Sequence, residues 1–238
     1  MDNMVKNLCI IQARLTSSRL PNKVLNTLGN SGRSMLEHVY ERLMESKHID
    51  KVVFAIPESA SNDELAFFLD SKSLEYVRGS EDNVLDRFYK CASVYRPEYI
   101  IRSTCDNPFV DWALADYLIE QIGDNDLIGC KETPLGTSVS VFSMKSLESA
   151  YQNVTSVPEK EHVTPYILNH MNVKFIHYND YKFRLTVDEE KDFYLVNTLY
   201  EHLYQGTPIP NTVIYQYLET HPDLANYNTD VHQKQVGE

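Results

Sequence analysis

LCIIQARLTSSRLPNKVL, from Leu8 to Leu25, is the stretch that decides the fold. It opens with a short apolar run that contains β-branched residues and has no helical period, which predicts a buried strand. The loop that follows carries the cations Arg14, Arg19 and Lys23, with hydroxyl residues between them. Pro21 prevents a helix from running through this loop, because proline lacks an N–H and clashes with the preceding turn.

The composition of this loop suits a phosphate group. Hydroxyls, backbone amides and fixed cations all bind phosphate oxygens, and ligands of open α/β sheets bind at the carboxyl ends of the strands. Neither G-x-x-x-x-G-K-[ST] nor G-x-G-x-x-G occurs in the chain. Residue spacing alone therefore leaves two interpretations open, a phosphate site and a solvated basic loop.

Strand and helix patterns alternate after the loop, which predicts an α/β fold with a mostly parallel sheet and helices on both faces. The expected helices are 34–46, 62–69, 82–95 and 111–122, with Asp111 as an N-cap, and the expected strands are 51–56, 74–77, 99–103 and one that opens at 127–128. Residues 1–238 are expected to form a single domain.

The pattern loosens between about 130 and 183. Strands are expected at 137–142 and 173–178, and helices at 145–151 and 161–170. This region reads as a small antiparallel extension of the sheet, and an amphipathic helix at 189–204 closes the core.

The overall composition excludes several classes of protein. The net charge of −12 makes the chain a poor general binder of nucleic acid, since backbone binding needs a basic face. No apolar run approaches the length of a membrane span, and the N-terminal residues lack the apolar segment of a signal peptide. The four cysteines are scattered without a C-x-x-C pair, which favours reduced thiols and a cytoplasmic location.

Several long motifs carry a family resemblance. Q-A-R-L-T-S-S-R-L-P-N-K-V-L resembles the opening motif of the cytidylyltransferases that activate acidic sugars such as sialic acid and 3-deoxy-manno-octulosonate. The likeness is greatest to the spore-coat polysaccharide biosynthesis F-type branch. Further motifs follow in the order of that branch: R-G-S-E-D-N-V-L-D-R-F at 78–88, I-R-S-T-C-D-N-P-F-V-D at 101–111, E-H-V-T-P-Y-I at 161–167 and R-L-T-V-D-E-E-K-D-F at 184–193. The resemblance covers most of residues 5–205.

The resemblance implies a Rossmann-like nucleotidyltransferase fold, CTP as the nucleotide and a homodimer that forms through the 130–183 extension. It also implies that Arg14 and Lys23 grip the triphosphate, while the backbone near Gln12 and Ala13 holds the nucleoside. Thr104, in the third motif, is expected to contact the nucleotide as well.

The segment from Arg78 to Asn83 is the candidate for base recognition. It offers both donors and acceptors, which a cytosine edge requires, and Gly79 lets the backbone approach a flat ring. The alternative is a strand-to-helix turn in which Ser80 or Asp82 is the N-cap. One turn can serve both purposes, so Arg78, Ser80 and Asn83 remain candidates.

Asp106 and Asp188 are the candidate metal ligands. Each follows an apolar, strand-like segment and is therefore expected at the carboxyl edge of the sheet. Two carboxylates that face a nucleotide triphosphate suit Mg²⁺, which takes a few hard oxygen ligands and completes its octahedron with phosphate and water. Asp188 could instead cap the helix that begins at Glu189, and Asp106 could brace a turn before Pro108.

The acceptor side is expected to involve Glu161, His162, Arg184 and two serines. His162 could equally be a structural histidine. In the resembled branch the segment that matches Gly136 to Phe142 usually reads G-L-D-V-E-V-F, whereas Ser138 and Ser140 stand at both acidic positions here. The loss of two carboxylates favours an acceptor that carries its own carboxylate or phosphate.

These expectations converge on a Mg²⁺-dependent cytidylyltransferase that joins CMP to an acidic sugar or sugar phosphate and releases pyrophosphate. A sugar-nucleotide-dependent glycosyltransferase is an alternative, but its usual Asp-x-Asp motif is represented only by occurrences such as 124–126, in a polar turn. A non-catalytic nucleotide-binding protein is a third possibility, against which the intact cations and carboxylates argue.

Overall fold

The strand at the centre of the fold is β1 (Asn7–Gln12), which the opening apolar run predicted. Cys9 and Ile11 lie in one buried cluster and Leu8 and Ile10 in another, so side chains alternate between two packed faces. Such a strand belongs inside a sheet that helices cover on both sides. The computed structural model describes residues 5–233.

The described residues form a sheet of seven strands in the order β3-β2-β1-β4-β6-β5-β7. The other strands are β2 (Lys51–Pro57), β3 (Tyr76–Gly79), β4 (Tyr99–Thr104), β5 (Leu127–Lys131), β6 (Ser140–Ser143) and β7 (Val173–His177). β6 runs antiparallel to both of its neighbours, and all the other pairings are parallel. The predicted mostly parallel α/β fold is confirmed.

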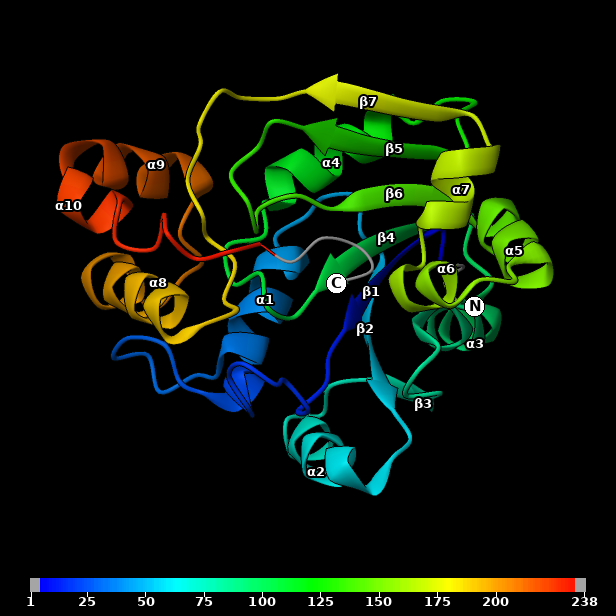
Figure 1. The fold of residues 1–238 in the computed structure, drawn as a ribbon, viewed down its shortest axis with the longest axis horizontal. Helices are drawn as coiled ribbons and strands as arrows, with labels where there is room; N and C mark the ends of the chain where they lie inside the picture. Colours follow the sequence, from blue (N-terminus) through cyan, green and yellow to red (C-terminus); the bar gives the residue numbers. More distant parts are fainter. Residues whose placement is uncertain (1–4, 234–238) are drawn as a thin grey trace.

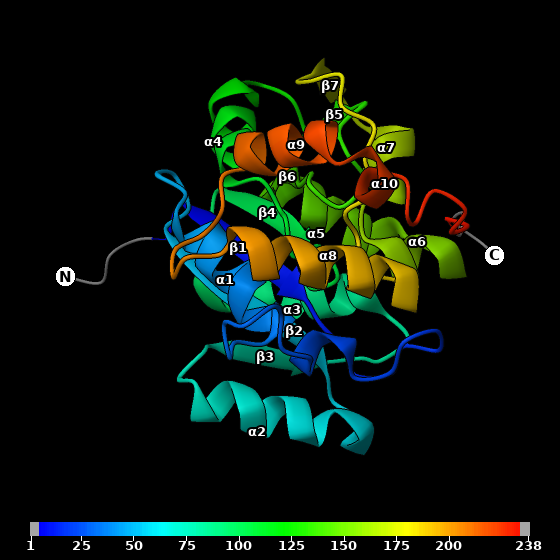
Figure 2. The same cartoon turned by 90° about the vertical axis from the view of Figure 1, so that its left-hand side faces the viewer.

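Helices cover both faces of this sheet (Figure 1). One face packs against α1 (Met35–Met44), α2 (Asp63–Ser71), α4 (Trp112–Gln121), α8 (Glu190–Leu203) and α9 (Asn211–Thr220), and the other against α3 (Val84–Tyr95), α5 (Met144–Asn153) and α7 (Pro165–His170). Two short helices, α6 (Val157–His162) and α10 (Pro222–Ala225), and the 3-10 turns Lys23–Leu25 and Ala60–Asn62 complete the elements. Figure 2 shows α1, α8 and α9 together on one side, with α2 beside the edge strand β3.

The predicted helix at 161–170 is wrong, because the chain breaks into α6 and α7. Val163, between them, has φ 64° and ψ −54°, and Thr164 N–H donates to His162 O at 2.7 Å. This is a strained γ-turn, uncommon for a β-branched residue. The Pro165 ring then starts a new helix, where its missing N–H costs nothing.

The predicted antiparallel extension of the sheet is confirmed in β6, but its strands have other bounds and neighbours than expected. Only the second half of the expected strand 137–142 is a strand, and it lies between β4 and β5 in the main sheet. Val141 and Phe142 are fully buried there. The strand at 173–177 runs parallel to β5 and forms the sheet edge. The region 130–183 is therefore part of the main sheet rather than an exposed strand pair.

The C-terminal helices α9 and α10 were not predicted. Buried Arg42 of α1 connects the start of α9 to the core, since its Nε donates to Val110 O at 2.8 Å and its Nη1 to Ile209 O at 2.6 Å. Among the described residues, no helix is both long enough and apolar enough to cross a lipid bilayer.

Candidate functional site

A cleft of about 230 Å³ opens where β1 and β4 end. It contains residues from both strand ends, from the loop after β1, from the first turn of α3, from the end of α6 and from the segment before α8. Its lining comprises Gln12, Ala13, Arg14, Ser17, Ser18, Arg19, Lys23, Val24, Val84, Arg87, Thr104, Cys105, Asp106, Glu161, His162 and Asp188. The sequence thus brings five separate motifs to the edge of the sheet where ligands of this fold class bind.

The loop after β1 is packed and not simply solvated. Leu15 and Val24 are buried, and Leu15 N–H donates to Oδ1 of the fully buried Asn62 at 2.9 Å. Asn22, in a left-handed conformation with φ 57°, donates from its backbone N–H to Leu15 O at 3.1 Å. These contacts fix the loop, so its cations are held at the cleft.

Lys23 lies between the two carboxylates that were expected to bind metal. Its side chain is 9 % exposed, and Nζ is 3.6 Å from Asp106 Oδ2 and 3.4 Å from Asp188 Oδ1. Nζ also donates to Val187 O at 2.5 Å. Val187 N–H donates to Asp106 O at 2.8 Å, which joins the two acidic segments directly.

The donor set fits a divalent cation of the hard type. Both carboxylates already converge on one positive charge, and carboxylate oxygens are the ligands that Mg²⁺ takes in phosphate-transfer sites. Asp106 is more accessible, with 35 % of its side chain exposed against 12 % for Asp188. The Asp188 carboxylate is therefore the more enclosed of the two, and the Asp106 carboxylate is the more open to solvent.

Asp188 is not the cap of the following helix. Glu189 occupies the N-cap position of α8. Instead, the Asp188 carboxylate receives Arg19 at 3.2 Å on Oδ1 and Arg184 at 3.0 Å on Oδ2. A helix cap would use its carboxylate on backbone N–H groups, whereas this one is engaged by three cations.

Arg87 is a cleft residue that the sequence interpretation missed, although it lies inside the motif at 78–88. It is 2 % exposed, and its Nη1 donates to Ser80 O at 2.6 Å and Glu81 O at 2.9 Å. Burial and, secondarily, the nearby charge of Arg14 lower the pKa of Arg87 to about 10. Two neighbouring cations at one wall create a site for an anion. The sequence signal that could have identified Arg87 was its expected position in the first turn of a helix that begins at the sheet edge.

Arg78, Ser80 and Asn83 do not line the cleft. Asn83 is the N-cap of α3, since Asp86 N–H donates to its Oδ1 at 2.9 Å, and Ser80 Oγ accepts from Asn83 N–H at 3.2 Å. Neither Ser80 nor Asp82 is the cap. Arg78 donates to the Pro57 and Ser59 carbonyls. The turn therefore supports the wall that carries Arg87, and base recognition by these residues stays a prediction.

Three comparisons with known proteins agree with this geometry. The family model described as cytidylyltransferase matches residues 8–235. The chain belongs to the cytidylyltransferase family. It is 32% identical to the spore coat polysaccharide biosynthesis protein SpsF of Bacillus subtilis, over 92% of this chain and 96% of that protein.

Solved structures share the fold of this cytidylyltransferase. A cytidylyltransferase from Leptospira borgpetersenii superposes with a TM-score of 0.85 at 23% identity, covering 96% of this chain and 100% of that one. A CMP:2-keto-3-deoxy-manno-octonic acid synthetase complexed with CTP superposes with a TM-score of 0.67 at 15% identity, covering 83% of this chain and 99% of that one. The enzyme is therefore a nucleotidyltransferase by family and by fold.

Only some of the residues that were expected on the acceptor side of the enzyme line the cleft. Glu161 and His162 line the cleft at the end of α6, directly before the strained γ-turn. Arg184 lies behind the lining and pairs with Asp188 and Asp192. Ser138 and Ser140 do not line the cleft, and Ser140 faces Arg102 across the β4–β6 pairing. A direct acceptor contact by the two serines stays a prediction that this geometry does not favour.

Cys105 also lines the cleft but is unsuited to nucleophilic chemistry. It is 2 % exposed, and burial raises the pKa of its thiol. A thiol held in its neutral form is a poor nucleophile.

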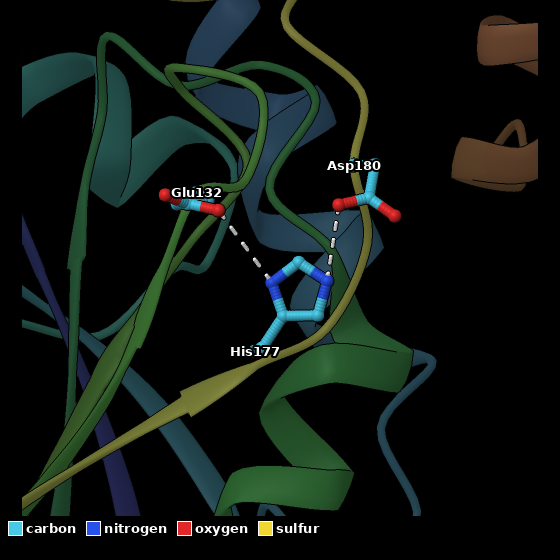
Figure 3. Close-up of side chains that lie close together, drawn as sticks. All are labelled: Glu132, His177 and Asp180. Carbon is cyan, nitrogen blue, oxygen red and sulfur yellow. Dashed lines mark ion pairs between the residues drawn. The ribbon is translucent and has the colours of Figure 1, made fainter.

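A second group of potential metal ligands lies outside the cleft, around the carboxyl ends of β5 and β7. Figure 3 shows Glu132 and Asp180 on opposite sides of the His177 ring. Glu132 Oε2 is 3.9 Å from Nδ1, and Asp180 Oδ1 is 3.2 Å from Nε2. All three residues are exposed, and exposed acidic groups of this kind are common without a bound ion. We assign this group to surface ion pairing.

Proposed function

We propose that this cytidylyltransferase transfers CMP from CTP to an acidic sugar or a sugar phosphate, with Mg²⁺ as cofactor and with release of pyrophosphate. The product would serve surface polysaccharide or glycan biosynthesis, in keeping with the name of the relative SpsF. The observation that carries the proposal is the position of the Asp106 and Asp188 carboxylates on either side of the Lys23 ammonium.

The residues of the chain divide the work between them. Arg14, Lys23 and Arg87 bind and orient the triphosphate, because fixed cations pair strongly with phosphate oxygens. Asp106 and Asp188 would hold Mg²⁺, which when bound neutralises phosphate charge and lowers the pKa of an attacking hydroxyl. Catalysis of this kind consists mainly of positioning and charge stabilisation.

The acceptor enters from the side of α6, where Glu161 and His162 border the cleft. An acceptor hydroxyl placed there attacks the α-phosphorus in line, and the cations of the β1 loop stabilise the departing pyrophosphate. The backbone at Gln12 and Ala13, together with Thr104, would hold the nucleoside at the joined ends of β1 and β4, where these residues line the cleft.

An anionic acceptor is supported by a cation beneath the cleft. Arg102 Nη2 donates to Gln12 Oε1 at 3.2 Å, and its Nε is buried without a hydrogen-bond partner in the described part of the chain. Ser140, directly opposite on β6, supplies no charge. The resembled branch usually has glutamate at this position, and its carboxylate would offset the charge of Arg102. With serine here, the positive charge of Arg102 can attract an acceptor carboxylate or phosphate.

The glycosyltransferase alternative loses support from its own motif. Asp126, in the 124–126 turn, accepts from Asn172 N–H at 3.1 Å and from Ser146 Oγ at 3.2 Å. These contacts connect the start of β5 to α5 and to the residue before β7, so the Asp126 carboxylate has a structural role.

A homodimer and a cytoplasmic location remain part of the proposal. All four cysteines are free thiols, which suits a reducing compartment. The edge strand β7 carries Phe175, 44 % exposed, and an unpaired edge of this kind is commonly covered by another chain.

A pyrophosphate-release screen tests the proposal. Each nucleoside triphosphate is combined with a panel of acidic sugars and sugar phosphates, at fixed Mg²⁺. We expect release with CTP and an anionic acceptor, and none with the Asp106→Asn or Asp188→Asn variant. Release that persists in both variants would contradict the assignment of the cleft.

A further inference from the structure

The C-terminal strap, residues 226–233, lies beside the cleft although no motif in the sequence assigned it a role. It follows α10, and Figure 1 shows it as the red trace that runs from α10 towards the centre of the molecule. Its contacts reach the groups that hold Asp188. Arg19 donates from Nη1 to the strap backbone at His232 O, at 3.5 Å, and pairs with Asp188 through Nη2.

Asn228 is the buried anchor of the strap, with 0 % exposure. Its Nδ2 donates to Asp192 Oδ1 at 2.7 Å and to Arg184 O at 3.1 Å. Both N–H groups of the Asn228 amide are thus used within the Arg184–Asp192 pair. Loss of either hydrogen bond would leave a buried polar group without a partner, which carries a desolvation cost.

Asp192 is the hub that joins the strap to the metal-ligand segment. Its carboxylate also accepts from Arg184 Nε at 2.8 Å and from Asp188 N–H at 2.9 Å. Burial opposes ionisation, but the hydrogen bonds from Arg184, the Asp188 N–H and Asn228 outweigh it and hold the pKa of Asp192 below its usual range. Asp192 is therefore a fixed negative charge within a closed network.

Arg184 is held on three sides by this network. Besides Asp192, it donates from Nη2 to Asp188 Oδ2 at 3.0 Å and from Nη1 to Gln233 Oε1 at 2.6 Å. Nε and Nη2 of Arg184 make two parallel bonds to the Asp192 carboxylate, at 2.8 and 3.1 Å, the arrangement that a guanidinium prefers. Nη2 is shared with Asp188 and engages only one oxygen of that carboxylate.

We propose that the C-terminal strap is a positioning device for Asp188. Asn228 and Gln233 fix Arg184 so that Asp188 Oδ2 is engaged while Oδ1 stays directed towards Lys23 and the cleft. The strap thereby sets the orientation of a carboxylate that the proposed function uses as a metal ligand, and this inference rests on that proposed role.

The test compares two isosteric variants of the strap. Asn228→Asp keeps the shape of the buried side chain and places an acceptor against Asp192. Asp230→Asn is the matched control, because it removes only the exposed ion pair with Lys191. Melting temperatures establish that both variants fold. Gln233→Ala is the second probe, since this exposed residue can be changed without disturbing the core.

Binding of Mn²⁺ is followed by electron paramagnetic resonance, and turnover is followed at varied metal and CTP concentrations. For Asn228→Asp we expect at least fivefold weaker Mn²⁺ binding, a matching rise in the metal concentration for half-maximal turnover and at least tenfold lower kcat, with the KM for CTP within twofold. Gln233→Ala should move the same quantities less, and Asp230→Asn should move none.

The outcomes separate this inference from the proposed function. Unchanged Mn²⁺ affinity in both Asn228→Asp and Gln233→Ala would overturn the positioning role, as would equal losses in Asp230→Asn. A wild-type chain that does not bind Mn²⁺ through Asp188, judged with Asp188→Asn, would overturn it too. Mn²⁺ binding that depends on Asn228, in a chain without CTP turnover, would leave the strap intact and refute the proposed function.

Discussion

Replacement of Lys23 by methionine isolates the charge at the centre of the cleft. The substitution keeps the apolar stem of a side chain that is 9 % exposed and removes the ammonium that lies 3.4 Å from Asp188 and 3.6 Å from Asp106. It also removes the donor to Val187 O. The effects on stability and on turnover can therefore be worked out separately.

The loss of stability depends on which groups lose their partner when the Lys23 ammonium is removed. Breaking a buried ion pair typically costs about 3–5 kcal/mol. Asp188 keeps Arg19 and Arg184, and Asp106 is 35 % exposed to water. We therefore expect a smaller loss of about 2 kcal/mol, part of it from the unmet carbonyl of Val187.

The functional effect should be larger. A fixed cation at developing phosphate charge is worth about a hundred- to a thousandfold in rate, and CTP binding should weaken as well. Mg²⁺ should raise the melting temperature of Lys23→Met more than that of the wild type, because ligands stabilise the state they bind and the carboxylates have lost their cation. Chemical unfolding measures the change in stability, calorimetric titration measures the affinity for CTP, and pyrophosphate release measures turnover.

Lys72→Met is the matched control, since Lys72 forms a partly exposed ion pair with Glu37 and lies over the Phe68 ring, outside the cleft. It should change stability by about 1 kcal/mol or less and leave turnover alone. The reasoning is refuted if Lys23→Met binds CTP with wild-type affinity and turns over at the wild-type rate.

Three further predictions concern the frame of the site. Asp106→Asn and Asp188→Asn should each fold and lose turnover by about a hundredfold or more; wild-type rates at ordinary Mg²⁺ would remove them as ligands. Gly136→Ala should lower the free energy of unfolding by more than about 1 kcal/mol, because Gly136 has φ +93° and a Cβ would lie 2.7 Å from the Leu185 carbonyl carbon; an unchanged urea midpoint would argue against this close packing. Burial, with a smaller effect from the charge of Arg33, lowers the pKa of His38 from 6.5 to about 4. As the pH falls, His38 therefore binds a proton in the unfolded chain before it does so in the folded chain. The contribution of His38 to the free energy of unfolding is complete above pH 6.5 and decreases by about 3 kcal/mol towards pH 4. His38→Phe should flatten this dependence in urea unfolding at several pH values, and an identical slope would exclude His38 as its source.

The parts of the fold that local pattern decides were predictable from the sequence. The apolar run inside β1 is short and partly β-branched, which favours a buried strand. Asp111 caps α4 by accepting from the Ala113 and Leu114 N–H groups, as its position before an amphipathic helix indicated. Asp106 and Asp188 were each expected at the sheet edge, and the structure brings them to the same ammonium.

The parts that long-range contacts decide were not predictable. β6 lies between β4 and β5 because of pairings far apart in the chain, and alternation alone could not show its neighbours. Val163 breaks a helical pattern by adopting a strained conformation, which its residue type disfavours. Arg87 and Asn228 become important only when α3 and the C-terminal strap reach the cleft region.

The fate of the α-phosphate of CTP tests the central claim most directly. The enzyme is incubated with Mg²⁺, its anionic acceptor and CTP labelled at the α-phosphorus, and then in parallel with CTP labelled at the γ-phosphorus. The account predicts that the α label appears in a CMP-linked acceptor and the γ label in pyrophosphate, in equal amounts, and that both signals disappear in Asp188→Asn. An acceptor that never gains the α label, or that gains it equally in Asp188→Asn, would contradict the account.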